Sequence, residues 1–319
     1  GESLALMPGT YSILNDEGVL YVGTTNGLFY HSNKVFLPVE NITYQCWQMI
    51  ATPKGILAAT SNGLYRISNK NNTQQLSNQN TMCVKEAPMG FYTGEPDGVY
   101  FNGDNGSRSK VADLERVTHI YVDEKKDLWI QNLYGIIWCK KANEKDFHPV
   151  SVDKDTTVPG MIVPTNKGLL TISANQEKPI PYPQFAYLDK EGTTWLTKSD
   201  GRGLYCMKDG SKLHNLETQL NAISEYNVRD MLIYKHDIIM GGDFGLIVYK
   251  QNHHDPILES KPKVYLRSIK LNGDSILWGG YGDMPEQLPT LNSDERHLRF
   301  TFAISHAPLT GQTLYRYTT

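Results

Sequence analysis

Glycine followed at once by a branched aliphatic residue recurs along this chain at nearly constant intervals. Successive copies are 36, 35, 37, 33, 35 and 42 residues apart. The seven copies are Gly27-Leu28, Gly63-Leu64, Gly98-Val99, Gly135-Ile136, Gly168-Leu169, Gly203-Leu204 and Gly245-Leu246. A fixed period in this range indicates repeated supersecondary units, each of which buries its apolar face against its neighbours. The repeat therefore constrains the fold more than any single side chain does.

A second turn marker precedes most of the repeat glycines by eight or nine residues. Its members are glycine or aspartate, which tolerate the backbone of tight turns: Gly18, Gly55, Gly90, Asp127, Gly160 and Asp237. The short segments between the two markers, as at residues 20–22, 128–130 and 161–163, are rich in aromatic and β-branched residues. We predict that each forms the second strand of its repeat. A strand before it, one after the repeat glycine and a weaker fourth complete the unit.

Four antiparallel strands in about 36 residues are the content of one β-propeller blade, and propellers typically have four to eight blades. Helical repeats of similar period would need amphipathic runs, and the sequence has none. We therefore predict an all-β chain in which residues 1–255 form a seven-bladed β-propeller.

Two segments resemble the two-component regulator propeller repeat. That repeat reads roughly as aspartate-x-x-glycine-x-leucine-tryptophan, a hydrophobic residue, and then glycine-threonine-x-x-glycine-leucine. Residues 16–28 read DEGVLYVGTTNGL and residues 191–196 read EGTTWL, and the first of these matches best. The third to fifth copies depart from the pattern, with Gln131-Asn132 or Pro164-Thr165 in place of glycine-threonine.

The C-terminal segment is similar to the opening of the triple-tyrosine (Y_Y_Y) domain. The similarity lies in residues 261–273, 298–303 and 314–317. In the family this domain is an immunoglobulin-like β-sandwich placed directly after the propellers. The resemblance implies that residues 256–319 are the N-terminal part of such a sandwich. Because a full sandwich would have further strands, we expect this part to leave an exposed strand edge.

Together the two resemblances imply a sensor. Members of the family are membrane-spanning sensors, commonly hybrid histidine kinases with a response-regulator output. Many sense oligosaccharides and switch on genes for carbohydrate use. They usually carry two seven-bladed propellers, whereas this sequence has one, with no kinase motif, membrane-spanning run or output domain. The resemblance implies a non-catalytic periplasmic part of an inner-membrane protein. It implies an oligosaccharide ligand, no cofactor, homodimerisation of the full receptor, and membrane attachment only through segments outside this chain.

Composition excludes some partners. The net charge is −3 and the pI is near 6.3, and the Lys and Arg residues are scattered. The sequence therefore has no basic cluster of the kind that binds nucleic acid. The four cysteines, Cys46, Cys83, Cys139 and Cys206, are widely spaced and form no CxxC motif, so we expect buried free thiols. The pair His253-His254 with Asp255 lacks a further ligand at a suitable spacing, and we interpret it as a polar linker without a metal.

The sixth repeat contains the candidate binding feature. Its hairpin at residues 198–203 is two or three residues longer than the others, and insertions in a repeat often form the binding face. Asp200 and Arg202 in this hairpin are candidates for hydrogen bonds to sugar hydroxyls. Equivalent hairpins offer Tyr134, Asp243 and Phe244. The alternative for each is an ordinary solvated hairpin. Acidic turns such as residues 123–127 are interpreted as turn chemistry without calcium.

Two other classes of function stay open. A propeller lyase or glycosidase would place its site at the central channel, and a glycosidase needs two carboxylates beside the scissile bond. A structural propeller with no ligand of its own is the third class. We predict no catalytic residue and no metal ligand in this sequence.

Overall fold

The computed structural model describes residues 9–69, 72–150, 158–174, 183–197, 200–208, 212–215, 226–250, 263–273, 275–280, 290 and 297–304. The chain divides into two compact units, Gly1–Gln251 and Asn252–Thr319. All regular elements within these ranges are β-strands, which confirms the all-β class. The described ranges accordingly contain no helix that could cross a membrane. The predicted domain boundary at residue 255 lies outside the described residues.

The described part of the first unit forms seven antiparallel sheets, which follow one another along the chain. Four sheets at the start have four strands each: β1 Thr10–Asp16, β2 Val19–Thr24, β3 Gly27–Ser32 and β4 Val35–Pro38; β5 Cys46–Thr52, β6 Gly55–Thr60, β7 Gly63–Asn69 and β8 Asn72–Ser77; β9 Cys83–Ala87, β10 Gly90–Glu95, β11 Gly98–Gly103 and β12 Arg108–Ala112; β13 Val117–Val122, β14 Leu128–Asn132, β15 Ile137–Lys140 and β16 His148–Pro149. The other three are β17 Gly160–Thr165 with β18 Gly168–Ser173; β19 Ala186–Leu188, β20 Thr193–Leu196, β21 Tyr205–Lys208 and β22 Lys212–Asn215; and β23 Val228–Tyr234, β24 Asp237–Gly242 and β25 Gly245–Lys250.

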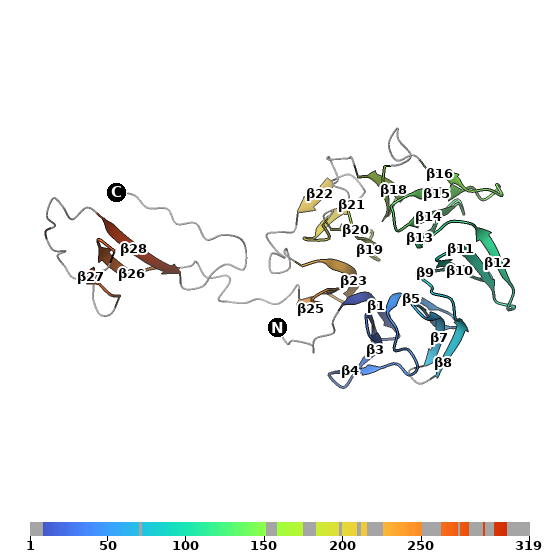
Figure 1. The fold of residues 1–319 in the computed structure, drawn as a ribbon, viewed down its shortest axis with the longest axis horizontal. Helices are drawn as coiled ribbons and strands as arrows, with labels where there is room; N and C mark the ends of the chain where they lie inside the picture. The colour runs from blue at the N-terminus through green and yellow to red at the C-terminus, as the bar shows by residue number, and fades with distance from the viewer. Residues whose placement is uncertain are drawn as a thin grey trace. The chain divides into compact units, whose positions relative to one another are not determined.

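These sheets are arranged in a ring, as in a β-propeller (Figure 1). The first strands of the sheets, such as β1, β5 and β9, lie toward the centre, and the fourth strands, such as β4 and β8, lie at the rim. The last sheet lies beside the first, with β23 next to β1. The predicted propeller is therefore confirmed as the architecture of this unit.

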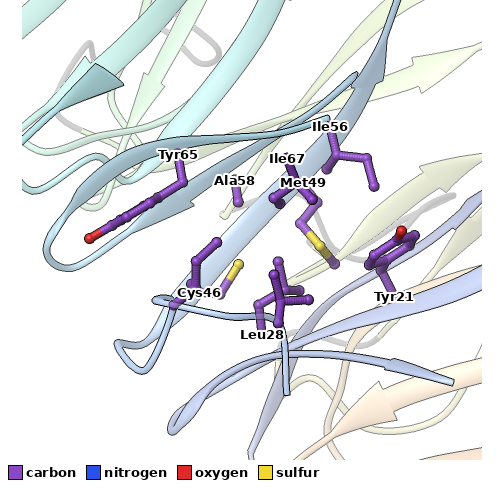
Figure 2. Packing of buried hydrophobic residues seen from close by; sticks show 10 residues of the cluster. Tyr21, Leu28, Cys46, Met49, Ile56, Ala58, Tyr65 and Ile67 are labelled. Atoms are coloured by element: carbon purple, nitrogen blue, oxygen red, sulfur yellow. The ribbon is translucent and has the colours of Figure 1, made fainter. Parts of the chain in front are cut away.

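The core lies between neighbouring sheets (Figure 2). Leu28 of β3 is buried against the second sheet together with Tyr21 of β2, and Cys46, Met49 and Ile56 come from that second sheet. Burying an aliphatic side chain of this size contributes about 1.5–3 kcal/mol. Each sheet thus depends on its neighbour for much of its stability.

Backbone hydrogen bonds join neighbouring sheets in a repeated pattern. In the first, second, fourth and sixth sheets, the residue before the first strand accepts a hydrogen bond from the hairpin between the second and third strands. In the fourth sheet the N–H of Arg116 donates to the carbonyl of Pro96 in the preceding sheet, at 3.1 Å, and the N–H of Leu133 donates to the carbonyl of Arg116, at 2.9 Å. We call the side of the ring that carries these hairpins, which include Ser61-Asn62 and Leu133-Tyr134, the hairpin face.

The fifth sheet differs from the prediction. Residues 161–163 were expected in a second strand, with Gly168 in the hairpin after it. Instead, the N–H of Gly160 donates to the carbonyl of Gly135, at 2.7 Å, and the N–H of Ala174 donates to that of Pro159, at 2.8 Å. The start of β13 makes the same two kinds of hydrogen bond, one to the preceding sheet and one within its own sheet. β17 is therefore the first strand of the fifth sheet, and β18 is the second. The turn at Gly168 therefore lies on the side opposite the hairpin face.

Burial supports this register. β17 is buried at its start, as the first strands are, and β18 is buried at its end, as the second strands are. The prediction was wrong because one turn chemistry occurs at both positions. Thr60 Oγ1 donates to the Gly63 carbonyl after a second strand, at 2.7 Å, and Thr52 Oγ1 donates to the Gly55 carbonyl after a first strand, at 2.6 Å. Thr165 and Gly168 repeat it at 2.8 Å.

The described part of the second unit is one antiparallel sheet in the order β27-β26-β28. Its strands are β26 Val264–Leu271, β27 Ser275–Trp278 and β28 Leu298–Ile304. Ile269 is fully buried opposite Phe300, whose side chain is half exposed. The immunoglobulin-like sandwich stays a prediction.

The four cysteines are free thiols, as predicted. Cys46, Cys83 and Cys139 are buried, whereas Cys206 is half-buried. Burial raises the pKa of Cys46 and of Cys83 to about 12. These two thiols are therefore protonated at neutral pH and act as small apolar core residues.

Candidate functional site

The lengthened connection between β20 and β21 is fixed to the next sheet. Asp200 Oδ1 accepts the backbone N–H of Arg202 at 3.0 Å, which closes a tight turn. Arg202 forms a β-bridge with Asn227, and the N–H of Val228 donates to the carbonyl of Gly201 at 3.1 Å. The predicted candidates Asp200 and Arg202 are therefore both exposed and lie beside the start of β23.

The β24–β25 hairpin lies next to the start of β23 as well. Gly242 approaches the carbonyl of Asn227 so closely that any side chain at position 242 would overlap it. The ring of Phe244 packs on that of Tyr226, with centroids 5.2 Å apart. Asp243 Oδ1 pairs with Nη2 of Arg229 at 2.6 Å. Four of the five predicted candidates, Asp200, Arg202, Asp243 and Phe244, therefore gather around Asn227.

Tyr134 lies apart from the four candidates around Asn227. It lies in the β14–β15 turn of the fourth sheet, with its side chain 56% exposed. Its backbone N–H donates to Oδ1 of Asn132 at 3.0 Å, which shapes the turn. Tyr134 remains on the hairpin face, but on a sheet apart from the Asn227 group.

Four inner strands carry a β-bulge at one equivalent place, near the hairpin face. The register shifts lie between Thr10 and Ser12, Cys46 and Gln48, Val117 and His119, and Val228 and Asp230. The extra residues are Tyr11, Trp47, Thr118 and Arg229. A bulge redirects the side chain of its extra residue and is frequent beside functional sites. These four residues were not among the sequence candidates.

Three of the extra residues are in contact. The rings of Trp47 and Tyr11 meet edge to face, 5.2 Å apart at 74°. The guanidinium of Arg229 lies over the Tyr11 ring, 4.4 Å from its centroid. With Asp243, the ion-pair partner of Arg229, they form a continuous series that we call the bulge row: Trp47, Tyr11, Arg229 and Asp243. Trp47 Nε1 is shielded from solvent and has no hydrogen-bond partner in the described part of the chain.

The bulge row combines the groups that recognise a sugar ring. Aromatic faces pack on the ring C–H groups, and the guanidinium and carboxylate donate to and accept from its hydroxyls. A buried residue precedes each extra residue, but the extra residues range from threonine to tryptophan, so the sequence gives no strict signal for the bulge.

The residues after the bulges connect the inner strands. Asp230 Oδ2 accepts the N–H of Ile13 at 2.7 Å, Ser12 Oγ accepts that of Met49 at 3.0 Å, and Gln48 Oε1 accepts that of Val84 at 2.8 Å. Burial raises the pKa of Asp230 to about 7, although hydrogen bonds from Ile13, Met231 and Ser12 oppose the shift. Asp230 therefore has a structural role in closing the ring.

The raised pKa of Asp230 predicts a pH dependence of stability. The folded state holds this proton more tightly than the unfolded chain, so the associated stability is present below about pH 4 and is lost as the pH rises to about 7. In Asp230→Asn, we expect the loss of unfolding free energy between these pH values to shrink by about 3 kcal/mol. Urea titrations of both proteins at pH 4, 5, 6 and 7 measure it.

His119 is the necessary control for that measurement. Burial lowers its pKa to about 4, so its contribution to stability is lost as the pH falls from about 6.5 to 4, in the direction opposite to that of Asp230. Both proteins retain His119, so its contribution cancels in the difference between them. Identical pH profiles for the two proteins would show that Asp230 is ionised throughout.

Turn carboxylates in the first unit are occupied by internal hydrogen bonds. Asp189 Oδ1 accepts the N–H groups of Glu191 and Thr193, at 2.9 and 2.8 Å, and its Oδ2 accepts Trp195 Nε1 at 2.8 Å. Asp123 makes the same three bonds to Lys125, Asp127 and Trp129. No group of three or more potential metal ligands occurs in the described ranges. The pair His253-His254 lies outside them.

No protein-family model and no curated protein matches the sequence. Solved structures do match. The extracellular domain of the hybrid two-component system BT3049 from B. thetaiotaomicron has a TM-score of 0.64 and 13% identity, covering 93% of this chain and 46% of that one. The corresponding domain of BT4673 from the same organism gives 0.59 and 13%, with 93% and 48% covered. This chain thus spans about half the length of either ectodomain.

Enzymes with the same fold also match. A catalytically inactive variant of virginiamycin B lyase from Staphylococcus aureus, with quinupristin, has a TM-score of 0.60 and 12% identity, covering 76% of this chain and 95% of that one. Identities this low show the fold alone.

Proposed function

We propose that this chain is part of the extracytoplasmic region of a membrane-bound two-component sensor and has no catalytic activity of its own. The observation that carries the proposal is the extent of the structural match. The sensor ectodomains match 93% of the chain, whereas the lyase matches 76%. The first unit alone ends at residue 251 of 319, so the larger coverage includes part of the second unit. A propeller followed by a further β-domain is the order that the sequence resemblance implies.

The ligand we propose is an oligosaccharide, bound on the hairpin face at the bulge row and the Asn227 group. Both sets of residues lie at the junction of the first, second, sixth and seventh sheets. In the full receptor, which we expect to be a periplasmic homodimer, the ligand would favour one arrangement of domains or subunits. It shifts that equilibrium only by its difference in affinity for the two arrangements. Membrane attachment and kinase output would lie outside this chain.

Calorimetry with a panel of plant, host and microbial oligosaccharides tests the proposal. For a sugar that binds, Trp47→Ala and Arg229→Ala should each weaken binding at least 30-fold, equivalent to about 2 kcal/mol. Tyr234→Ala is the matched control, because Tyr234 is a partly exposed aromatic at the other end of β23. Its affinity should stay within twofold of the unmodified protein.

The same incubations separate the alternatives. Release of cleavage products would contradict a non-catalytic sensor and support a lyase or glycosidase. Heat from a longer ectodomain but none from this chain would show that this propeller is a scaffold. Binding that is unchanged in Trp47→Ala and Arg229→Ala would exclude the bulge row as the site.

A further inference from the structure

A cavity of about 220 Å³, half open to solvent, lies between the second and third sheets. Its lining includes Arg66 of β7, Leu76 of β8, Phe91 of β10, Asn102 of β11, Ser107 of the β11–β12 turn and Arg108 of β12. The bulge row is built from the starts of inner strands and from the β24–β25 hairpin. The two places therefore share no residue, and a ligand could bind at one without the other.

Arg66 is the unpaired charge of this cavity. Its Nε is shielded from solvent and has no hydrogen-bond partner, and Arg66 has no ion pair among the described residues. A buried donor without an acceptor is unfavourable, and more so when it is charged. The guanidinium charge is shared with the two terminal nitrogens, so an anion bound at those nitrogens would offset it.

The other charges around the cavity are balanced. Arg108 Nη2 lies 2.7 Å from both carboxylate oxygens of Glu95, which is buried. Asp104 on the rim pairs with Lys54 at 2.8 Å. With these two pairs neutral, Arg66 leaves the cavity with one net positive charge. A monoanion is the complementary ligand.

The shape and lining restrict that anion further. Phe91 and Leu76 supply apolar surface, whereas the Ser107 hydroxyl and the Asn102 carbonyl oxygen supply polar groups; the amide nitrogen of Asn102 already donates to Thr93 Oγ1 at 3.1 Å. At about 30 Å³ for each water, the cavity holds roughly seven waters. That volume suits one sugar ring.

We propose that this cavity binds a monosaccharide acid, with the carboxylate on Arg66. The planar guanidinium matches a carboxylate in a two-point hydrogen bond, which an ammonium does not reproduce. The ring C–H groups lie toward Phe91 and Leu76, and the hydroxyls lie toward Asn102 and Ser107. Binding is non-covalent and involves no chemical step.

The test uses D-glucuronate as the probe, with D-glucose and sulfate as comparison ligands. The Arg66 Nε–H signal in a ¹H–¹⁵N spectrum should shift on adding glucuronate, and calorimetry should give at least tenfold weaker binding for glucose and for sulfate. Arg66→Gln should lose at least tenfold in affinity for glucuronate, and Arg66→Lys should recover only part of it. Arg116→Gln, which removes one exposed arginine elsewhere, should stay within twofold.

Arg66 has no ion pair among the described residues whose loss would destabilise the protein. Thermal unfolding of Arg66→Gln should therefore occur at or above the temperature of the unmodified protein. An Arg66 signal that does not move at about 10 mM glucuronate, a concentration that reveals even weak binding, would overturn the proposal. Equal affinity for glucose, equal affinity for sulfate, or unchanged binding by Arg66→Gln would overturn it as well. Trp47→Ala should bind glucuronate normally, so failure of the oligosaccharide site is recognised separately.

Discussion

Alanine at position 63 is expected to lower the free energy of unfolding by about 3–4 kcal/mol, because two costs combine there. Gly63 has φ +120°, a conformation that residues with a side chain rarely adopt. Its missing Cβ would also overlap the carbonyl oxygen of Ser77 at the end of β8. Urea or guanidinium unfolding followed by circular dichroism measures the loss.

Gly168→Ala is the matched control for this substitution. Gly168 has nearly the same φ, +113°, but no described atom lies within 4 Å of the place its Cβ would take. Only backbone strain applies, and we expect a loss of about 1–2 kcal/mol. Equal losses at the two positions would mean that strain alone matters and that the close approach of β8 to the hairpin does not.

Replacing Asp189 by alanine should cost about 3 kcal/mol, because one buried carboxylate serves three donors. It satisfies two backbone N–H groups and the indole N–H of Trp195, which is itself buried. Removing it leaves these donors without an acceptor, and each such loss costs about 1 kcal/mol or more. The fluorescence of Trp195 should change with the same variant, because its indole loses its assigned acceptor. Chemical unfolding measures the loss of stability.

The matched control is Asp123→Ala in the fourth sheet. Asp123 makes the same three bonds at 2.9, 2.9 and 3.0 Å, but Asp123 and Trp129 are only half-buried, so water can replace the lost acceptor. We expect about 1 kcal/mol. A loss as large as that for Asp189→Ala would contradict the assumption that burial sets the cost.

The architecture could be predicted from the sequence because a propeller repeats its turns. Gly27, Gly63 and Gly245 mark hairpins between second and third strands, as expected. Gly168 could not be assigned in the same way. Its Thr-x-x-Gly turn is chemically the same at both ends of a second strand, and only bonds to neighbouring sheets distinguish the two.

The grouping of the candidate residues could be predicted in part. Hairpin length and repeat position were sufficient to select Asp200, Arg202, Asp243 and Phe244, which the structure gathers around Asn227. Tyr134 satisfied the same criteria but lies on a separate sheet. The position of a residue within its repeat determines that it lies on the hairpin face, but not how near it is to the other candidates around the ring. Tyr11, Trp47 and Arg229 were missed because a β-bulge has no strict sequence pattern.

The bond between Asp230 and Ile13 also has a consequence for how this chain folds. The two residues are 217 positions apart in the sequence, so the first sheet has no finished neighbour on one side until the seventh has been synthesised. Contacts this distant slow folding, because a long loop must close before they form. During synthesis the early sheets would expose an unpaired flank to other chains. We expect the last step of folding, and the one most open to misassembly, to be the docking of β23 against β1.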